Sequence, residues 1–80
     1  MDRLDTRCRG LLLFLDQMGV LTPSSREHVI YQAMALENED FDIEQMKWVV
    51  LMVLFNQPGE EAAYAWMEDM VFENSHANLH

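Results

Sequence analysis

Cys8, the single cysteine of this 80-residue chain, is the side chain best suited to nucleophilic chemistry. It lies between Arg7 and Arg9, and nearby cations favour the reactive thiolate over the thiol. The same residue also falls on an apolar helical stripe, where a free cysteine behaves as a small hydrophobe. We therefore expect a buried structural thiol, and a chain with one cysteine has no internal disulfide.

Ser25 and His28 form a second possible pair, because residues three apart are neighbours on a helix and a hydroxyl beside a base is the start of a nucleophilic site. Nothing in the surrounding sequence supplies an oxyanion hole. Ser24 and Ser25 directly follow Thr22 and Pro23, a position where small hydroxyl residues cap helices. Capping is therefore their expected role. No catalytic residue is predicted, and we expect a protein that is not an enzyme.

Two sets of side chains resemble metal ligands without the required spacing. An acidic segment could offer carboxylate oxygens to Ca²⁺, but it lacks the central glycine and the closing glutamate of an EF-hand loop. The histidines include no pair four residues apart beside a carboxylate, as zinc ligands on a helix require. The acidic residues are Glu37, Glu39, Asp40, Asp42 and Glu44, and the histidines are His28, His76 and His80. No metal and no cofactor is predicted.

Apolar residues at helical spacing, bounded by capping signals, predict helices throughout the chain. The four predicted helices span about residues 3–18, 23–36, 43–56 and 59–72. Gly19 stands where a left-handed C-cap needs no side chain, Thr22 is an N-cap, and Asp42 with Gln45 forms a capping box. We expect an all-α fold: a small four-helix domain, orthogonal or bundle-like, over residues 1–73, followed by a polar C-terminal tail at 74–80.

The same periodicity predicts the core. In the first, second and fourth helices the predicted buried residues are Leu4, Cys8, Leu11, Leu12, Leu15 and Met18; Val29, Ile30, Ala33, Met34 and Leu36; and Ala63, Trp66, Met67 and Met70. Most of the seven methionines are expected to fill this core, with a methionine-lined partner groove as the other interpretation.

The third helix contains the longest apolar run, the eight residues from Trp48 to Phe55. This run is too short to span a bilayer, which needs about 20 apolar residues, so it predicts the buried central element of a small domain. Asn56, which follows the run, can adopt the left-handed conformation at the end of this helix. We expect Trp48 to be a buried anchor, so that Trp48→Ala costs ~3–5 kcal/mol of stability.

Charge limits the classes of partner. The chain carries five basic and fourteen acidic residues, a formal net charge of −9. Phosphate groups are bound by Lys and Arg, so direct binding to nucleic acid or to an anionic membrane is disfavoured. A helix-turn-helix-like nucleic-acid module, built on the second and third helices, is the alternative; its recognition helix would present only Gln45, Lys47 and Asn56.

A protein partner is the favoured interpretation. Tyr64 and Trp66 are two residues apart on one short helix, so they lie on different faces and cannot both be buried against one core. Aromatic side chains are favoured interface anchors. We expect them to form a contact surface with the adjoining turn, Asn56, Gln57, Pro58 and Gly59. A weak homodimer is a further possibility for the isolated chain.

The strings Lys47-Trp48-Val49, Leu51-Met52-Val53-Leu54-Phe55-Asn56 and Pro58-Gly59 resemble the carboxy-terminal half of the bacterial Smg protein family. The resemblance implies a longer protein whose N-terminal half is absent here and could itself be the partner. It implies no catalytic residues. It also implies a cytoplasmic protein, which agrees with the lack of a signal peptide, and a gene neighbourhood linked to DNA processing or early translation.

Overall fold

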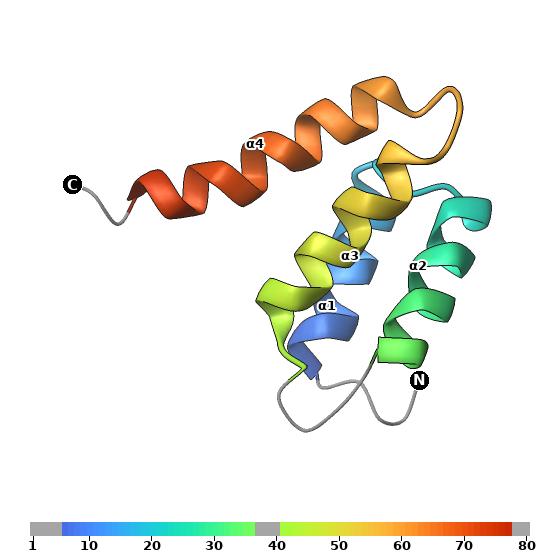
Figure 1. Ribbon diagram of the computed structural model, residues 1–80, viewed down its shortest axis with the longest axis horizontal. Coiled ribbons are helices and arrows are strands. Elements are labelled where there is room, and N and C mark those ends of the chain that lie inside the picture. Colours follow the sequence, from blue (N-terminus) through green and yellow to red (C-terminus); the bar gives the residue numbers. More distant parts are fainter. Residues whose placement is uncertain (1–5, 37–40, 78–80) are drawn as a thin grey trace.

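A computed structural model of the chain describes residues 6–36 and 41–77, with side chains up to residue 73. In these parts of the chain there are four helices and no strand, which confirms the all-α prediction (Figure 1). The helices are α1 (Thr6–Gln17), α2 (Pro23–Leu36), α3 (Ile43–Phe55) and α4 (Glu61–Ala77). The fourth helix is longer than predicted, so residues 74–77, expected in a polar tail, are helical.

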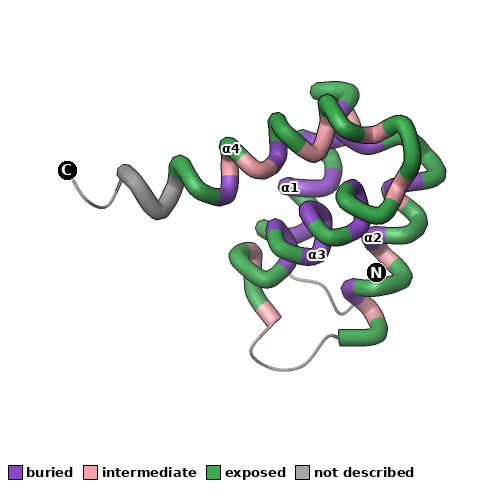
Figure 2. The backbone as a smooth tube through the Cα atoms, turned by 45° about the horizontal axis from the view of Figure 1, so that its top comes forward, coloured by how far each residue is buried: buried purple, intermediate pink, exposed green. Residues whose placement is uncertain are grey.

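Helix α3 is the central element, as its apolar run predicted. It contacts α1, α2 and α4. Helices α1 and α2 lie beside it, whereas α4 runs across one end of this group and then extends away from it (Figure 1). Buried residues line the sides of the helices that face one another (Figure 2). The arrangement fits the expected small domain of crossing helices.

Both predicted N-terminal caps are present. The Thr22 hydroxyl accepts a hydrogen bond from the Ser25 backbone N–H at 3.1 Å, and the Thr22 N–H donates to the Ser25 hydroxyl at 2.8 Å. The same reciprocal pattern joins Asp42 and Gln45, with distances of 3.0 and 3.3 Å. Each pair satisfies amide groups that a helix start would otherwise leave unpaired.

Glycine closes α1 as predicted, whereas the end of α3 differs. Gly19 has φ of 79°, and the Val20 N–H reaches back to the Leu15 carbonyl at 2.9 Å, as in a Schellman cap. Asn56 does not take the left-handed conformation: its φ is −92°, and its side-chain amide donates to the Met52 carbonyl. The left-handed residue of this turn is Gly59, three residues after Asn56, with φ of 88°. The chain therefore reverses direction at Gly59 and not at Asn56.

The core contains most of the residues that periodicity selected. It includes Cys8, Leu11, Leu12, Leu15, Val29, Ala33, Met46, Val50, Leu54, Met67 and Val71. Two predicted core residues are instead exposed: Met18 lies beyond the end of α1, and Leu36 is the last residue of α2. Trp66, which lies on the predicted stripe of a helix too short to bury both of its large aromatics, is partly exposed. Leu4 lies outside the described residues.

Trp48 is the main correction. Its side chain is 46% exposed, so it is not the buried anchor that the apolar run predicted. An unbroken run of apolar residues carries no information about which face of the helix stays uncovered, and Trp48 lies on that face. Because its ring is only partly buried, Trp48→Ala should cost less than the ~3–5 kcal/mol expected for a fully buried aromatic.

Candidate partner-binding face

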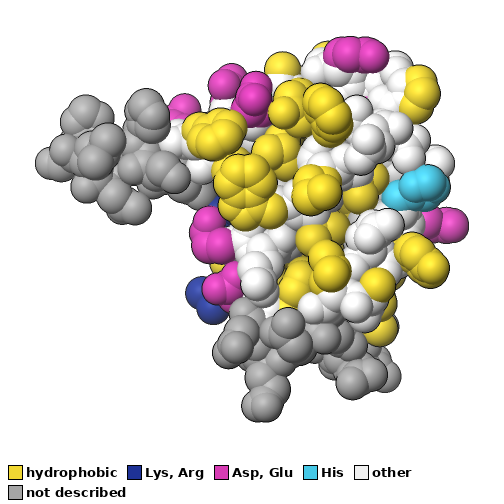
Figure 3. Space-filling model, in the orientation of Figure 1, with side chains coloured by type: hydrophobic (Ala, Val, Ile, Leu, Met, Phe, Trp, Pro, Cys, Tyr) yellow, Lys and Arg dark blue, Asp and Glu magenta, His cyan; other side chains and the backbone are white. Residues whose placement is uncertain are grey.

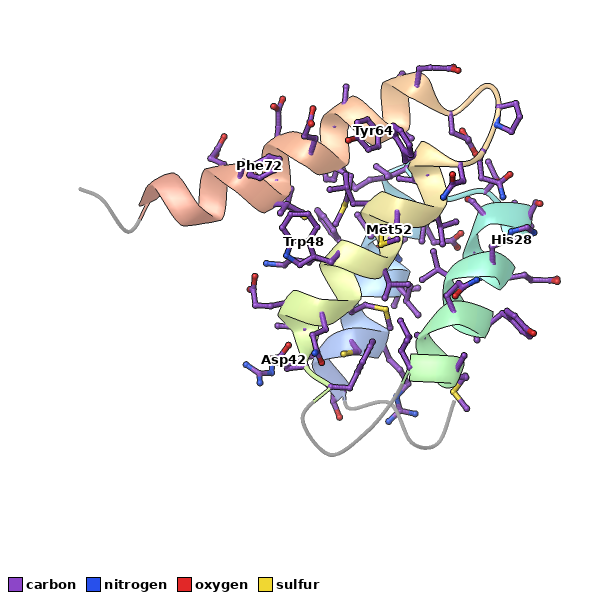
Figure 4. All side chains as sticks on the ribbon, viewed as in Figure 1. His28, Asp42, Trp48, Met52, Tyr64 and Phe72 are labelled. Atoms are coloured by element: carbon purple, nitrogen blue, oxygen red, sulfur yellow. The ribbon has the colours of Figure 1, made fainter. Side chains whose placement is uncertain are left out.

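The outward side of α3 presents a row of large apolar side chains. Trp48, Met52 and Phe55, at positions i, i+4 and i+7, are 46%, 63% and 72% exposed. The other sides of α3 are covered by its three neighbours, and because the helix is apolar all round, the side left over is apolar too. Figure 3 shows apolar side chains gathered at the centre of this side of the molecule, where Figure 4, in the same orientation, labels Trp48 and Met52.

Helix α4 adds two aromatic rings to this row. Phe72 lies edge-on to Trp48, with ring centroids 5.9 Å apart, and Tyr64 lies 5.5 Å from Phe55 (Figure 4). We call the surface formed by Trp48, Met52, Phe55, Tyr64 and Phe72 the aromatic face. A shallow hollow of about 240 Å³ lies within it, lined by Trp48, Leu51, Met52, Phe55, Asn56 and Tyr64.

The aromatic face continues into a groove between α2 and α3. This groove has a volume of about 210 Å³, and Met52 and Asn56 line both hollows. Its lining residues are His28, Gln32, Leu36, Val49, Met52, Val53, Asn56 and Gln57. At one end the Gln57 side-chain amide lies 3.0 Å from Nδ1 of His28, which ties the α3–α4 turn to α2.

Acidic groups border the aromatic face. The Tyr64 hydroxyl donates to Oε2 of Glu68 at 3.4 Å, and the pKa of Tyr64 is raised first by desolvation and then by the charge and hydrogen bond of Glu68. Lys47, the one basic residue of α3, is largely buried and pairs with Glu44 at 3.3 Å. A recognition helix reads bases through exposed Arg, Lys, Asn or Gln, and α3 buries its one cation and exposes a row of large apolar side chains.

The structure divides the six predicted contact residues between two surfaces. Tyr64 and Asn56 line the hollow of the aromatic face, and Gln57 lines the adjoining groove. Pro58 and Gly59 are exposed in the turn that follows. Trp66 is 36% exposed on a different side of α4, where its ring lies 6.3 Å from that of Phe14 in α1.

Sequence reasoning missed Trp48, Met52, Phe55 and Phe72 as surface residues. The spacing of the first three is visible in the sequence, but an unbroken apolar run predicts a helix buried on every side. A run that is apolar all round is compatible with an exposed stripe on any of its faces, so the stripe is recognised only once the covered sides are known.

Cys8 and Ser25, the two side chains considered for nucleophilic chemistry, lie in places that serve the fold. Cys8 is fully buried in the core, and Ser25 is buried within the N-cap of α2. Over residues 6–36 and 41–73, no three His, Cys, Asp or Glu side chains gather where they could hold a metal ion. None of the helices that the structure describes has the length and apolar character needed to cross a membrane.

The chain is similar over nearly its whole length to curated bacterial proteins named Protein Smg homolog. It is 62% identical to the protein of Nitrosococcus oceani over 99% of this chain and 50% of the relative. Identity is 59% to that of Xylella fastidiosa and 55% to that of Stenotrophomonas maltophilia, in each case over 100% of this chain and 51% of the relative. The chain thus spans about half the length of these relatives.

No solved structure matches the chain. The family described as Protein of unknown function (DUF494) matches residues 1–80, and together with these relatives this match shows that the chain belongs to the Smg family, a family of uncharacterised function.

Proposed function

We propose that this domain is a non-enzymatic protein-interaction module that binds an apolar helix of a protein partner along its aromatic face. The observation that carries the proposal is the exposed row Trp48, Met52 and Phe55 on the central helix. Side chains at i, i+4 and i+7 form the seam by which one helix packs against another, and amphipathic helices dock into apolar grooves of this kind.

The composition of the row supports binding rather than incidental exposure. Single exposed apolar residues are normal, whereas contiguous apolar patches mark interaction sites. The row contains tryptophan and phenylalanine and is flanked by rings of Tyr64 and Phe72. Aromatic residues are enriched at the centres of protein interfaces, where truncating one of them is most costly.

Three further proposals concern the whole protein: which half of it this chain forms, where it is located and which process it serves. The family resemblance is the basis for two proposals: that the chain is the C-terminal half of the longer protein, and that this protein serves DNA processing or early translation. The proposal of a cytoplasmic protein rests on the resemblance together with the sequence, in which no signal peptide is visible. No observation on the described residues favours the helix-turn-helix alternative, because Lys47 is paired and largely buried.

Site-specific photocrosslinking tests the proposal. A benzophenone amino acid is placed at Met52 in a full-length family protein carrying this domain, in bacterial cells, and at Tyr31 as a matched control. Tyr31 is 74% exposed on α2 and lies outside the aromatic face. We expect a crosslink from position 52, mapped by mass spectrometry to the apolar side of a helix, and none from position 31.

A second substitution separates specific docking from chance proximity. Phe55→Asp on the aromatic face should remove the crosslink from position 52, whereas Leu13→Asp, at an exposed site on α1, should leave it. Both variants should remain helical, which circular dichroism checks. A position-52 probe that gives no product, or one that reacts equally in both variants, overturns the proposal.

A further inference from the structure

The aromatic face is a continuous apolar surface, of the kind that is usually covered by another segment or partner. Its three α3 residues each leave about half or more of the side chain in water, and they adjoin Phe72 and the apolar groove beside α2. Apolar surface left in water loses the hydrophobic free energy of burial, in proportion to its area. A continuous face of this kind therefore favours a permanent cover over an occasional one.

The length of the relatives supplies a segment to cover it. Proteins 55–62% identical to this chain are about twice as long, so a segment as long as the domain itself lies outside it in those proteins. A segment tethered to the domain is present at a high effective concentration, which makes its docking far more favourable than that of a free partner with the same contacts.

Charge disfavours a second copy of this domain as the occupant. Each copy carries a formal net charge of −9. Glu44 lies one helical turn before Trp48, and Glu68 binds the Tyr64 hydroxyl, so a symmetric pair would bring acidic borders together. Like charges placed opposite each other oppose association.

The arrangement of α3 and α4 fits a docked helix. Helix α4 crosses α3 and then runs away from it, and Phe72 stands beside Trp48 where the two helices diverge (Figures 1 and 4). A helix laid along the α3 row would contact α3 on one side and the aromatic rings of α4 on another. Packing against two helices in this way buries more apolar area than contact with α3 alone.

We infer that, in the full-length Smg proteins, an apolar helix from the half outside these 80 residues docks on Trp48, Met52 and Phe55. The inference rests on the proposed function in one respect, that the aromatic face binds a helix. It goes further in naming the occupant as part of the same polypeptide.

Cysteine accessibility in the purified full-length protein tests this inference. Met52→Cys and Tyr31→Cys variants are alkylated with iodoacetamide, and the rate at each site is read from its own peptide by mass spectrometry. Both positions are exposed in the isolated domain. We expect the cysteine at 52 to react at least about tenfold more slowly than that at 31, as for a site reached only by local opening.

Dilution and a second substitution identify the cover. An intramolecular cover protects position 52 equally at micromolar and nanomolar protein, whereas protection by a second copy is lost on dilution. Phe55→Asp should abolish the protection, and Leu13→Asp, on a different helix, should preserve it.

Two results overturn the inference: equal alkylation rates at the two positions, or protection that disappears on dilution. Neither result alone overturns the proposed function. If position 52 still crosslinks to a helix of another protein in cells, the aromatic face is an interaction site with an external partner. If it neither crosslinks nor is protected, both the inference and the proposed function fail.

Discussion

Met46 and Met52 lie on the same helix and have opposite surroundings. Met46 is fully buried between the helices, whereas Met52 is mostly exposed on the aromatic face. Met46→Ala should lower the free energy of unfolding by about 2–5 kcal/mol, because it leaves a cavity in the core. Met52→Ala should change it by about 0.5 kcal/mol or less, as expected for a surface site. Urea unfolding of the two variants measures both values, and equal losses would show that Met52 is covered in the isolated domain.

Tyr64 offers a spectroscopic probe of the aromatic face. Its pKa is raised, first by desolvation and then by the charge and hydrogen bond of Glu68. In a Tyr31→Phe background Tyr64 is the only tyrosine, so phenolate absorbance reports it alone. Glu68→Gln should lower its pKa toward the ordinary value without reaching it, because desolvation, the larger cause, remains. A pKa unchanged by Glu68→Gln would show that the carboxylate does not contact the hydroxyl.

The raised pKa of Tyr64 also fixes the direction of a pH effect. The folded state holds the phenol proton more tightly than the unfolded state, so this contribution to stability is fully present below the ordinary tyrosine pKa of about 10. It is lost as the pH rises through the higher pKa of the folded state. Between these two values, unfolding of the Tyr31→Phe variant should become easier with rising pH, and adding Glu68→Gln should weaken that dependence.

At the scale of the helix, two glycines respond in opposite ways to the same substitution. Gly10 lies inside α1 with open space around it, so Gly10→Ala should raise stability by about 0.5–1 kcal/mol through helix propensity. Gly19 has φ of 79°, so Gly19→Ala forces a side chain into the left-handed region and should cost about 1–2 kcal/mol. Thermal unfolding followed by circular dichroism measures the change in stability of each variant. A Gly19→Ala variant that is more stable than the original protein would contradict the Schellman geometry.

The helix boundaries could be predicted because their signals are local. Thr22 with Ser25 and Asp42 with Gln45 act within three residues, so the sequence alone contains both partners of each cap. The end of α3 was less predictable. Asn56 satisfies the Met52 carbonyl with its side chain and needs no left-handed backbone, which leaves the chain reversal to Gly59.

The candidate site was only partly predictable because it depends on which sides of a helix are covered. The spacing of Tyr64 and Trp66 correctly placed them on different faces of α4, and the same spacing prevents them from forming one surface. The exposure of Trp48 depends on where α4 crosses α3, and that crossing is set by packing between segments distant in the sequence. Periodicity within α3 does not contain this information.

For the whole molecule, charge gives the plainest prediction. With a formal net charge of −9 and Lys47 paired to Glu44, the domain should not shift a DNA or RNA oligonucleotide in a gel at physiological salt. Added Zn²⁺ or Ca²⁺, or a chelator, should leave its melting temperature unchanged. Micromolar binding that weakens as salt rises would contradict the charge argument and revive the helix-turn-helix alternative.

Because α3 contacts each of the other helices, we expect the packed part of the domain to open as one unit. Separating α3 from any one neighbour exposes part of the single core cluster to which Met46 and Leu54 belong. Unfolding of the packed helices should therefore be cooperative, because they all contact α3. The amide hydrogens of α3 should exchange with solvent at rates set by one global opening, whereas those near the far end of α4, which extends away from the group, exchange by local fraying (Figure 1).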